Sequence, residues 1–125
     1  MLILDTHALI WWMTDDAHLP ARNRTRIADP SEDVAITTAT LYECSYKYKL
    51  GKTSVDVSVE LPELIRRNRF RVLDMTARVA VRAGRLSNAH RDPWDRIIAA
   101  HGIDSDSPVL TVDPSIAALG AKTLW

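Results

Sequence analysis

The sequence predicts a single α/β domain over residues 1–125, a three-layer α/β/α sandwich with a short central parallel sheet and more helix than strand. Three observations predict this architecture. Short apolar runs typical of buried parallel strands recur at residues 2–4, 34–37, 70–73 and 108–112. Segments with helical spacing lie between these runs, as right-handed crossovers require. A chain of 125 residues buries roughly two-thirds of its unfolded surface, which is enough for one core.

The composition excludes several classes of protein. Sixteen basic and sixteen acidic side chains cancel, so net charge does not attract the chain to nucleic acid, although charges can still separate in space. The single cysteine, Cys44, excludes an internal disulfide and a thiolate metal cage, and it fits a reducing compartment. The first residues lack a basic region and an apolar run near the ~20 residues of a membrane span. We therefore expect a cytoplasmic protein that is not anchored to a membrane.

In the first half of the chain we expect a strand at residues 2–4, helices at 8–13 and 21–28, a strand at 34–37 and a further helix from Thr40. Thr40 and Glu43 have the spacing of a capping box, in which each side chain bonds the other residue's backbone N–H. Gly51 follows Lys47 and Lys49, as expected for a glycine just past a helix end with cations in the last turn.

In the second half we expect a helix near residues 62–69, a strand at 70–73, a helix near 79–86, a helix opened by residues 90–95, a strand at 108–112, a helical turn near 116–119 and a short edge at 122–125. Asp92 is a good N-cap, and Pro93 suits the first helical position because its missing N–H has no partner there. Asp95 then falls one turn inside, where its charge meets the positive end of the helix dipole.

Four acids are placed to meet at one edge of this sheet. Asp5 and Asp113 directly follow apolar strands, and the working crevice of an open parallel sheet lies beyond the carboxyl ends of its strands. Helices that begin at this edge can present Glu43 and Asp95 to the same crevice. Four carboxylates without a cation repel one another, and a divalent ion removes the conflict. An all-oxygen ligand set suits Mg²⁺ or Mn²⁺, and such ions support the hydrolysis of phosphodiester bonds.

Five short pieces follow one another in a distinctive order: Leu2 to Trp12, Leu41 to Glu43, His90 to Arg96, Leu110 to Pro114, and Leu124 to Trp125. With this order and spacing the chain resembles the PIN-domain ribonucleases, specifically the VapC-type toxins of bacterial toxin–antitoxin pairs. The resemblance implies a PIN-like fold and a metal-dependent endoribonuclease that uses Mg²⁺ or Mn²⁺ to hydrolyse RNA. It further implies a homodimer and a cognate antitoxin that covers the acidic crevice.

The same resemblance assigns roles to the acids. It implies that Asp5, Glu43, Asp95 and Asp113 are catalytic and that Asp5, Asp95 and Asp113 bind the metal. Asp92 lies beside the third acid of the pattern, but an N-cap carboxylate turned toward its own helix is poorly placed to bind metal, so Asp95 is favoured. The chain departs from the pattern at Tyr42 and Cys44, which flank Glu43, and at the polar residues 102–107 before the last strand.

Several neighbours of the acids are candidates for supporting roles. Thr6 and Thr111 can orient a carboxylate or a water by hydrogen bonding, although threonines near strand ends are more often turn residues. Arg91 and Arg96 can hold substrate phosphates or pair with the carboxylates, and pairing is the simpler expectation. Asp92 remains a candidate as well.

Other residues have competing structural interpretations. His7 and His90 are potential general acids or bases because imidazole titrates near neutrality, but the family relies on water activated by metal. Trp11 and Trp12 can stack on bases, yet they are expected to fill the core and a subunit contact. The basic clusters at residues 47–52 and 66–69 are either phosphate tracks or solvated helix ends.

Two alternative functions remain. A receiver-like signalling domain has similar length and α/β order, and it would accept a phosphoryl group on Asp74 at the end of the third strand. The sequence disfavours it, because such a site needs paired acids after the first strand, where Thr6 and His7 follow Asp5, and a lysine near a later strand, where Asp113 stands. The second alternative is a PIN-like module that binds RNA or a partner without cutting.

Overall fold

The computed structural model describes residues 1–125, and it contains a five-stranded, fully parallel sheet with the order β3-β2-β1-β4-β5. The strands are β1 (Leu2–Leu4), β2 (Val34–Thr37), β3 (Arg71–Leu73), β4 (Val109–Leu110) and β5 (Thr123–Leu124). The helices are α1 (Thr6–Met13), α2 (Ala21–Ala28), α3 (Thr38–Lys49), α4 (Val57–Arg66), α5 (Ala77–Arg85), α6 (Pro93–Asp104) and α7 (Pro114–Ala118). The predicted α/β class with a parallel, helix-rich sandwich is confirmed.

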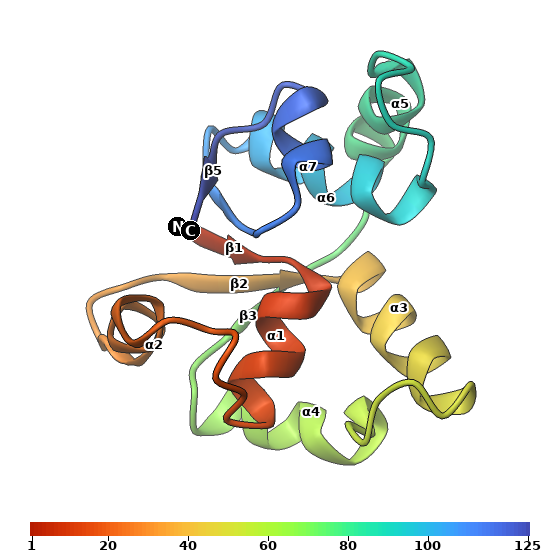
Figure 1. Ribbon diagram of the computed structural model, residues 1–125. Coiled ribbons are helices and arrows are strands. Elements are labelled where there is room, and N and C mark those ends of the chain that lie inside the picture. Colours follow the sequence, from red (N-terminus) through yellow and green to blue (C-terminus); the bar gives the residue numbers. More distant parts are fainter.

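Helices cover both faces of the sheet (Figure 1). Successive residues of a strand point to opposite faces, and in β1 Leu2 and Leu4 pack into one core while Ile3 packs into the other. The first core lies under α1, α2 and α4, and the second lies under α6 and α7. The strands β1, β2 and β4 are buried along their whole length, which explains their mainly apolar sequences, whereas the edge strands β3 and β5 are partly exposed.

The strand order reverses at the centre of the sheet, and this reversal positions the functional site. The chain runs outward from β1 through β2 to β3, then returns to place β4 on the other side of β1. The crossovers after β1 and β4 leave on opposite sides, and the working crevice of such a sheet lies beyond the carboxyl ends of these two strands. Asp5 follows β1 and Asp113 lies three residues after β4, which puts both acids at this reversal point.

The start of α3 differs from the expectation in its capping residue. The N-cap of α3 is Thr37, whose hydroxyl accepts the backbone N–H of Thr40 at 3.0 Å, so the predicted capping box of Thr40 with Glu43 is wrong. The strand runs directly into the helix, and the first available hydroxyl takes the cap. Glu43 is thereby left free to point elsewhere.

The helix expected from Pro62 begins five residues earlier, at Val57. Asp56 caps it by accepting the Ser58 N–H at 3.0 Å, and Pro62 lies inside the helix. Val57 is buried against Cys44, so packing of the first turn overrides the local stop signal of Pro62. No helix of the chain is long and apolar enough to span a bilayer.

Candidate metal centre

Asp5 occupies the centre of the strand-end crevice. It caps α1, because Oδ1 accepts the Ala8 N–H at 2.7 Å, and Oδ2 accepts the hydroxyl of Thr111. The residue is 5 % exposed. Burial raises the pKa of the Asp5 carboxyl above its usual range despite these hydrogen bonds, and the nearby charge of Asp95 adds to the effect. The hydrogen bonds therefore fix the position of the Asp5 carboxyl, but they do not fully offset the cost of burying its negative charge.

Thr111 forms hydrogen bonds to both Asp5 and Asp113. Its hydroxyl donates to Asp5 and accepts the backbone N–H of Asp113 at 3.0 Å. Asp113 in turn caps α7 by accepting the Ser115 N–H at 2.8 Å. Burial acts to raise the pKa of Asp113, but the hydrogen bonds from Ser115 and the nearby His90 and His7 outweigh it, so the pKa lies below its usual value. The structure therefore brings Asp5, Thr111 and Asp113 together.

Glu43 reaches the same crevice from α3. The hydroxyl of Thr6 donates to Glu43 Oε2 at 2.6 Å, and Lys47 Nζ lies 3.2 Å from Oε1. Each oxygen of the Glu43 carboxylate therefore has a partner, and the side chain is held facing the start of α1. Lys47 was expected only as part of a surface cluster; the i,i+4 spacing from Glu43 was the readable signal for this ion pair.

Asp92 and Asp95 divide two roles at the start of α6. Oδ1 of Asp92 accepts the N–H groups of Trp94 and Asp95 at 2.9 and 3.1 Å, so this acid is the N-cap and turns toward its own helix. Asp95 lies in the first turn, with Oδ2 2.7 Å from Nε2 of His90. Burial raises the pKa of Asp95, and repulsion from Asp92 and Glu43 raises it further against the opposing bond from His90.

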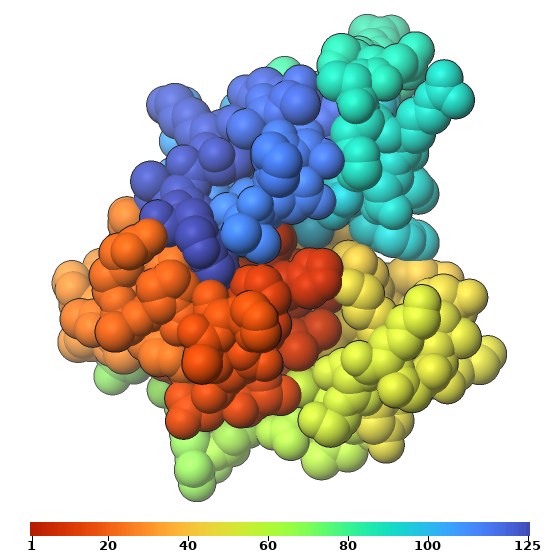
Figure 2. Space-filling view, in the orientation of Figure 1, coloured from red at the N-terminus to blue at the C-terminus, as the bar shows by residue number.

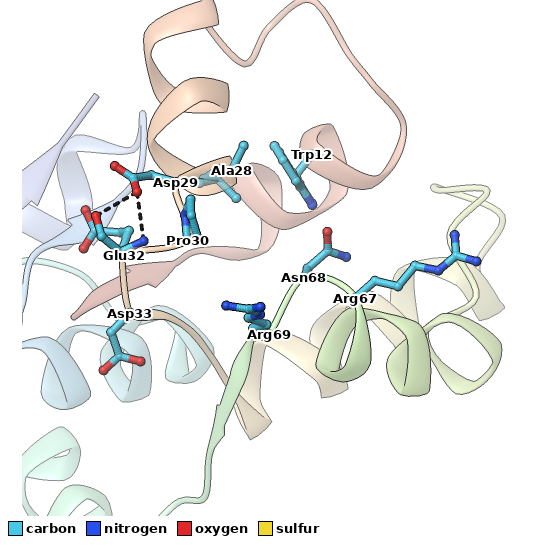
Figure 3. A pocket seen from close by; sticks show the side chains of 11 residues that line it. Trp12, Ala28, Asp29, Pro30, Glu32, Asp33, Arg67, Asn68 and Arg69 are labelled. Carbon is cyan, nitrogen blue, oxygen red and sulfur yellow. Dashed lines mark hydrogen bonds between the residues drawn. The ribbon is translucent and has the colours of Figure 1, made fainter.

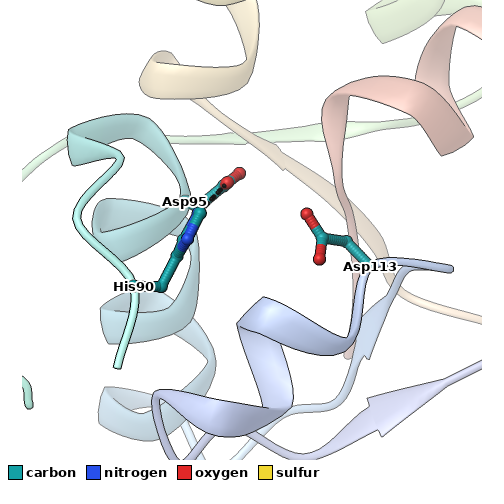
Figure 4. Close-up of side chains that lie close together, drawn as sticks. All are labelled: His90, Asp95 and Asp113. Atoms are coloured by element: carbon teal, nitrogen blue, oxygen red, sulfur yellow. Dashed lines mark hydrogen bonds and ion pairs between the residues drawn. The ribbon is translucent and has the colours of Figure 1, made fainter. Parts of the chain in front are cut away.

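His90, Asp95 and Asp113 converge on one point (Figure 4). One ligand atom from each residue lies within 4.8 Å of the other two. Asp95 and Asp113 come from the starts of different helices, α6 and α7, and their carboxylates face each other across the crevice. In the space-filling view the N-terminal segment, in red, lies between the blue C-terminal segment and the yellow α3 region, so distant parts of the chain meet here (Figure 2).

Arg96 does not face the acids. Its guanidinium donates to backbone carbonyls alone, those of Ala83, Gly84, Leu86, Ser87 and His90. The expectation that Arg96 pairs with carboxylates or holds phosphate is therefore replaced by a different role: the side chain ties the end of α5 and the loop before α6 onto α6. Sequence reasoning missed this role because backbone acceptors carry no sequence signal.

The residues of this centre fit a divalent cation. Asp5 is buried and Asp95 is half-buried, and burial and neighbouring carboxylates raise the pKa of both; a cation at this place removes that cost. Lys47 supplies the one ammonium close to the acids, and it is taken by Glu43. The carboxylate oxygens of Asp5, Asp95 and Asp113 are donors of the kind that Mg²⁺ and Mn²⁺ bind, and His90 places an imidazole nitrogen beside them.

Comparison with known families gives this arrangement its context. A model of the PIN domain family matches residues 2–122. The chain belongs to the PIN domain family. The family is one of nucleases that generally use divalent metal. Comparison with curated protein sequences finds no match.

Solved structures share the fold of this PIN domain at low identity. A chain of VapBC2 from Rickettsia felis, crystallised with a DNA fragment from its promoter, superposes with a TM-score of 0.72 at 17 % identity, covering 98 % of this chain and 96 % of that one. A chain of FitAcB from Neisseria gonorrhoeae gives 0.69 at 18 %, covering 100 % and 97 %. A chain of VapBC-1 from nontypeable Haemophilus influenzae gives 0.69 at 18 %, covering 98 % and 96 %.

The receiver-like alternative does not fit the PIN domain seen here. Receiver domains have the strand order 2-1-3-4-5, whereas here β3 is an edge strand. Asp74 is exposed at the end of β3, with β2 between it and β1, so it lies outside the acidic crevice. Asp74 is therefore a strand-end acid that does not join the centre.

A separate hollow of about 580 Å³ lies at the opposite edge of the sheet, between the α2–β2 and α4–β3 loops (Figure 3). Acidic residues of one loop, such as Asp33, and basic residues of the other, such as Arg69, line it. Asp33 is paired with Arg71 at 3.0 Å. This hollow lies at the amino ends of β2 and β3, so it is not part of the acidic crevice.

Proposed function

We propose that this PIN domain is a metal-dependent endoribonuclease that hydrolyses RNA phosphodiester bonds and acts as the toxin of a toxin–antitoxin pair. The observation that supports the proposal is that Asp95 and Asp113 meet at the strand-order reversal of a nuclease fold, where Thr111 links Asp113 to Asp5 and Thr6 holds Glu43 beside the start of α1. The toxin role is supported by the fold shared with chains of VapBC and FitAcB complexes.

Asp5, Asp95 and Asp113 would hold Mg²⁺ or Mn²⁺. When bound, such a cation polarises the phosphate, lowers the pKa of water and stabilises the charge that develops during in-line attack. Asp5 is preorganised for this task because its oxygens are fixed by the Ala8 N–H and the Thr111 hydroxyl. A carboxylate oxygen can accept more than one partner, so these bonds leave capacity for a cation.

Glu43 and Lys47 define the other side of the reaction site. Thr6 orients Glu43 through its 2.6 Å hydrogen bond, which keeps a carboxylate beside the attack site. Lys47 Nζ is paired with Glu43 and lies 3.4 Å from Nε2 of His7, so it holds Glu43 in place, and a substrate phosphate would have to compete with Glu43 for this ammonium. Asp92, as the N-cap of α6, positions Asp95 without entering the crevice.

We further propose a homodimer and an antitoxin partner. Tyr42 and Tyr46 are 52 % and 49 % exposed on one side of α3, and Tyr42 packs on Trp94 of α6 with ring centroids 4.3 Å apart. Exposed stacked aromatics of this kind are enriched in protein interfaces. This patch flanks the acidic crevice, so pairing two copies there would bring two reaction sites onto one assembly.

The proposal is tested with labelled RNA and the purified full chain freed of any antitoxin. We expect cleavage with Mg²⁺ or Mn²⁺, none in excess chelator, and none for Asp5→Ala. Asp74→Ala is the matched control, because Asp74 also ends a strand but is exposed and outside the centre; it should cleave as the wild type does. Cleavage that persists in chelator or in folded Asp5→Ala would refute the proposed site, and absence of cleavage with intact metal binding would favour a non-cleaving module.

A further inference from the structure

His90 lies at the acidic centre without belonging to the four acids. Its Nε2 is 2.7 Å from Oδ2 of Asp95, and one ligand atom each from His90, Asp95 and Asp113 forms a set within 4.8 Å. The side chains of His90 and Asp95 are 25 % and 23 % exposed, so both are partly withdrawn from solvent. The imidazole is thus directed at the Asp95 carboxylate, which in turn faces Asp113 (Figure 4).

The loop that carries His90 is fixed by a single side chain. Arg96 donates to the His90 carbonyl at 2.9 Å and to the Ser87 carbonyl at 2.7 Å through the same nitrogen. Its other nitrogens hold the carbonyls at the end of α5. Because Arg96 follows Asp95 directly in α6, the loop and the acid are fastened to the same helical turn. These hydrogen bonds therefore hold His90 in a fixed position beside Asp95.

We propose that His90 supplies a nitrogen ligand, through Nε2, to the cation held by Asp95 and Asp113, and that this makes the centre prefer Mn²⁺ to Mg²⁺. The inference rests on the proposed function, since it concerns the same metal. Neutral imidazole is a better ligand for first-row transition metals, Mn²⁺ included although it is the weakest binder among them, than for Mg²⁺, which is bound mainly by oxygen ligands. A centre built from carboxylates alone would lack this nitrogen ligand and the preference for Mn²⁺ over Mg²⁺ that it provides.

The geometry is compatible with direct ligation. Two ligands on one ion are at most about 4.2 Å apart when each bond is about 2.1 Å long, and the three atoms here span no more than 4.8 Å. A movement of about 0.6 Å in one of these side chains would close that difference. The competing role for His90 is a hydrogen bond that only orients Asp95, in which case the nitrogen stays outside the metal's coordination shell.

The two roles are separated by pulsed electron paramagnetic resonance of Mn²⁺ added to the metal-free full chain. Direct ligation gives nitrogen hyperfine modulation of the bound Mn²⁺, and we expect this signal in the wild type. It should disappear in His90→Gln and persist in His7→Gln, the matched control, because His7 is the other imidazole near the acids. Circular dichroism verifies that both variants fold.

Affinity gives a second readout. We expect His90→Gln to weaken Mn²⁺ binding by at least about tenfold and to weaken Mg²⁺ binding much less, so that the Mn²⁺ preference is lost. Absence of nitrogen modulation in the wild type, or modulation that survives His90→Gln, would overturn the inference. If the wild type binds Mn²⁺ without nitrogen modulation and still cleaves RNA, this inference alone fails; if it binds neither metal, the proposed function fails too.

Discussion

Replacing Arg96 by Met should destabilise the protein more than any other change at an exposed or half-buried arginine. One guanidinium donates hydrogen bonds to the carbonyls of five residues, at distances of 2.7 to 3.4 Å. A hydrogen bond to a charged group contributes about 1.5–3 kcal/mol. The five bonds are not additive, because they share one side chain and water can reach several of the freed carbonyls. We therefore expect a loss of about 2–4 kcal/mol, which is a large part of the about 5–15 kcal/mol typical of a domain.

The loss is measured by urea unfolding followed by tryptophan fluorescence, with chelator present so that metal binding does not contribute. Arg91→Met is the matched control: Arg91 is an exposed arginine of the same loop, and its replacement should change the free energy of unfolding by less than about 0.5 kcal/mol. Arg96→Lys should fall between the two, because an ammonium offers three donors from one point and cannot span five carbonyls. An Arg96→Met protein as stable as Arg91→Met would refute the assigned role.

Three further outcomes are expected. Burial raises the pKa of Asp95 above 3.8, so ionisation of this carboxyl lowers the stability of the metal-free folded state as pH rises from 3.8 through the raised pKa. Asp95→Asn cannot ionise, so its free energy of unfolding relative to the wild type should increase across this pH range and then become constant. A difference between the two proteins that does not change with pH would contradict this expectation. Burial raises the pKa of the Cys44 thiol to about 11, so Ellman's reagent at pH 7.5 should label it only after unfolding, and rapid labelling of the native protein would show that the site is open. Gly102→Ala places a Cβ 3.0 Å from Cγ2 of Val109 and should lower the free energy of unfolding by up to about 3 kcal/mol. Gly84→Ala meets nothing within 4 Å and should raise it by up to about 1 kcal/mol through the helix propensity of alanine in α5. Equal melting temperatures for the two variants would contradict this expectation.

Local patterns predicted those features that depend on near neighbours in the chain. Asp92 and Pro93 signal the start of α6 because a cap and a first-turn proline act within one helical turn, and the structure has both. Asp5 and Asp113 could be placed at one edge because parallel strands share the direction of their carboxyl ends.

Features that depend on distant partners were not predictable in the same way. Thr40 and Glu43 fit a capping box locally, but Glu43 bonds Thr6, which is 37 positions away. The helix start at Val57 depends on a contact with Cys44, and Pro62 alone suggested otherwise. Arg96 binds backbone carbonyls, which every residue offers, so its sequence neighbours could not reveal its partners.

The hydrogen bond between Thr111 and Asp5 has a consequence for the order of events during synthesis, because its partners lie near opposite ends of the chain. It bonds Asp5 across a separation of 106 positions, and β1 obtains its second neighbour only when β4 has been made. A ribosome therefore releases nearly the whole domain before the first acid meets the last, and no shorter nascent chain contains a complete centre. The site proposed for catalysis therefore cannot assemble before β4 has been synthesised, whatever the order in which the earlier strands pair.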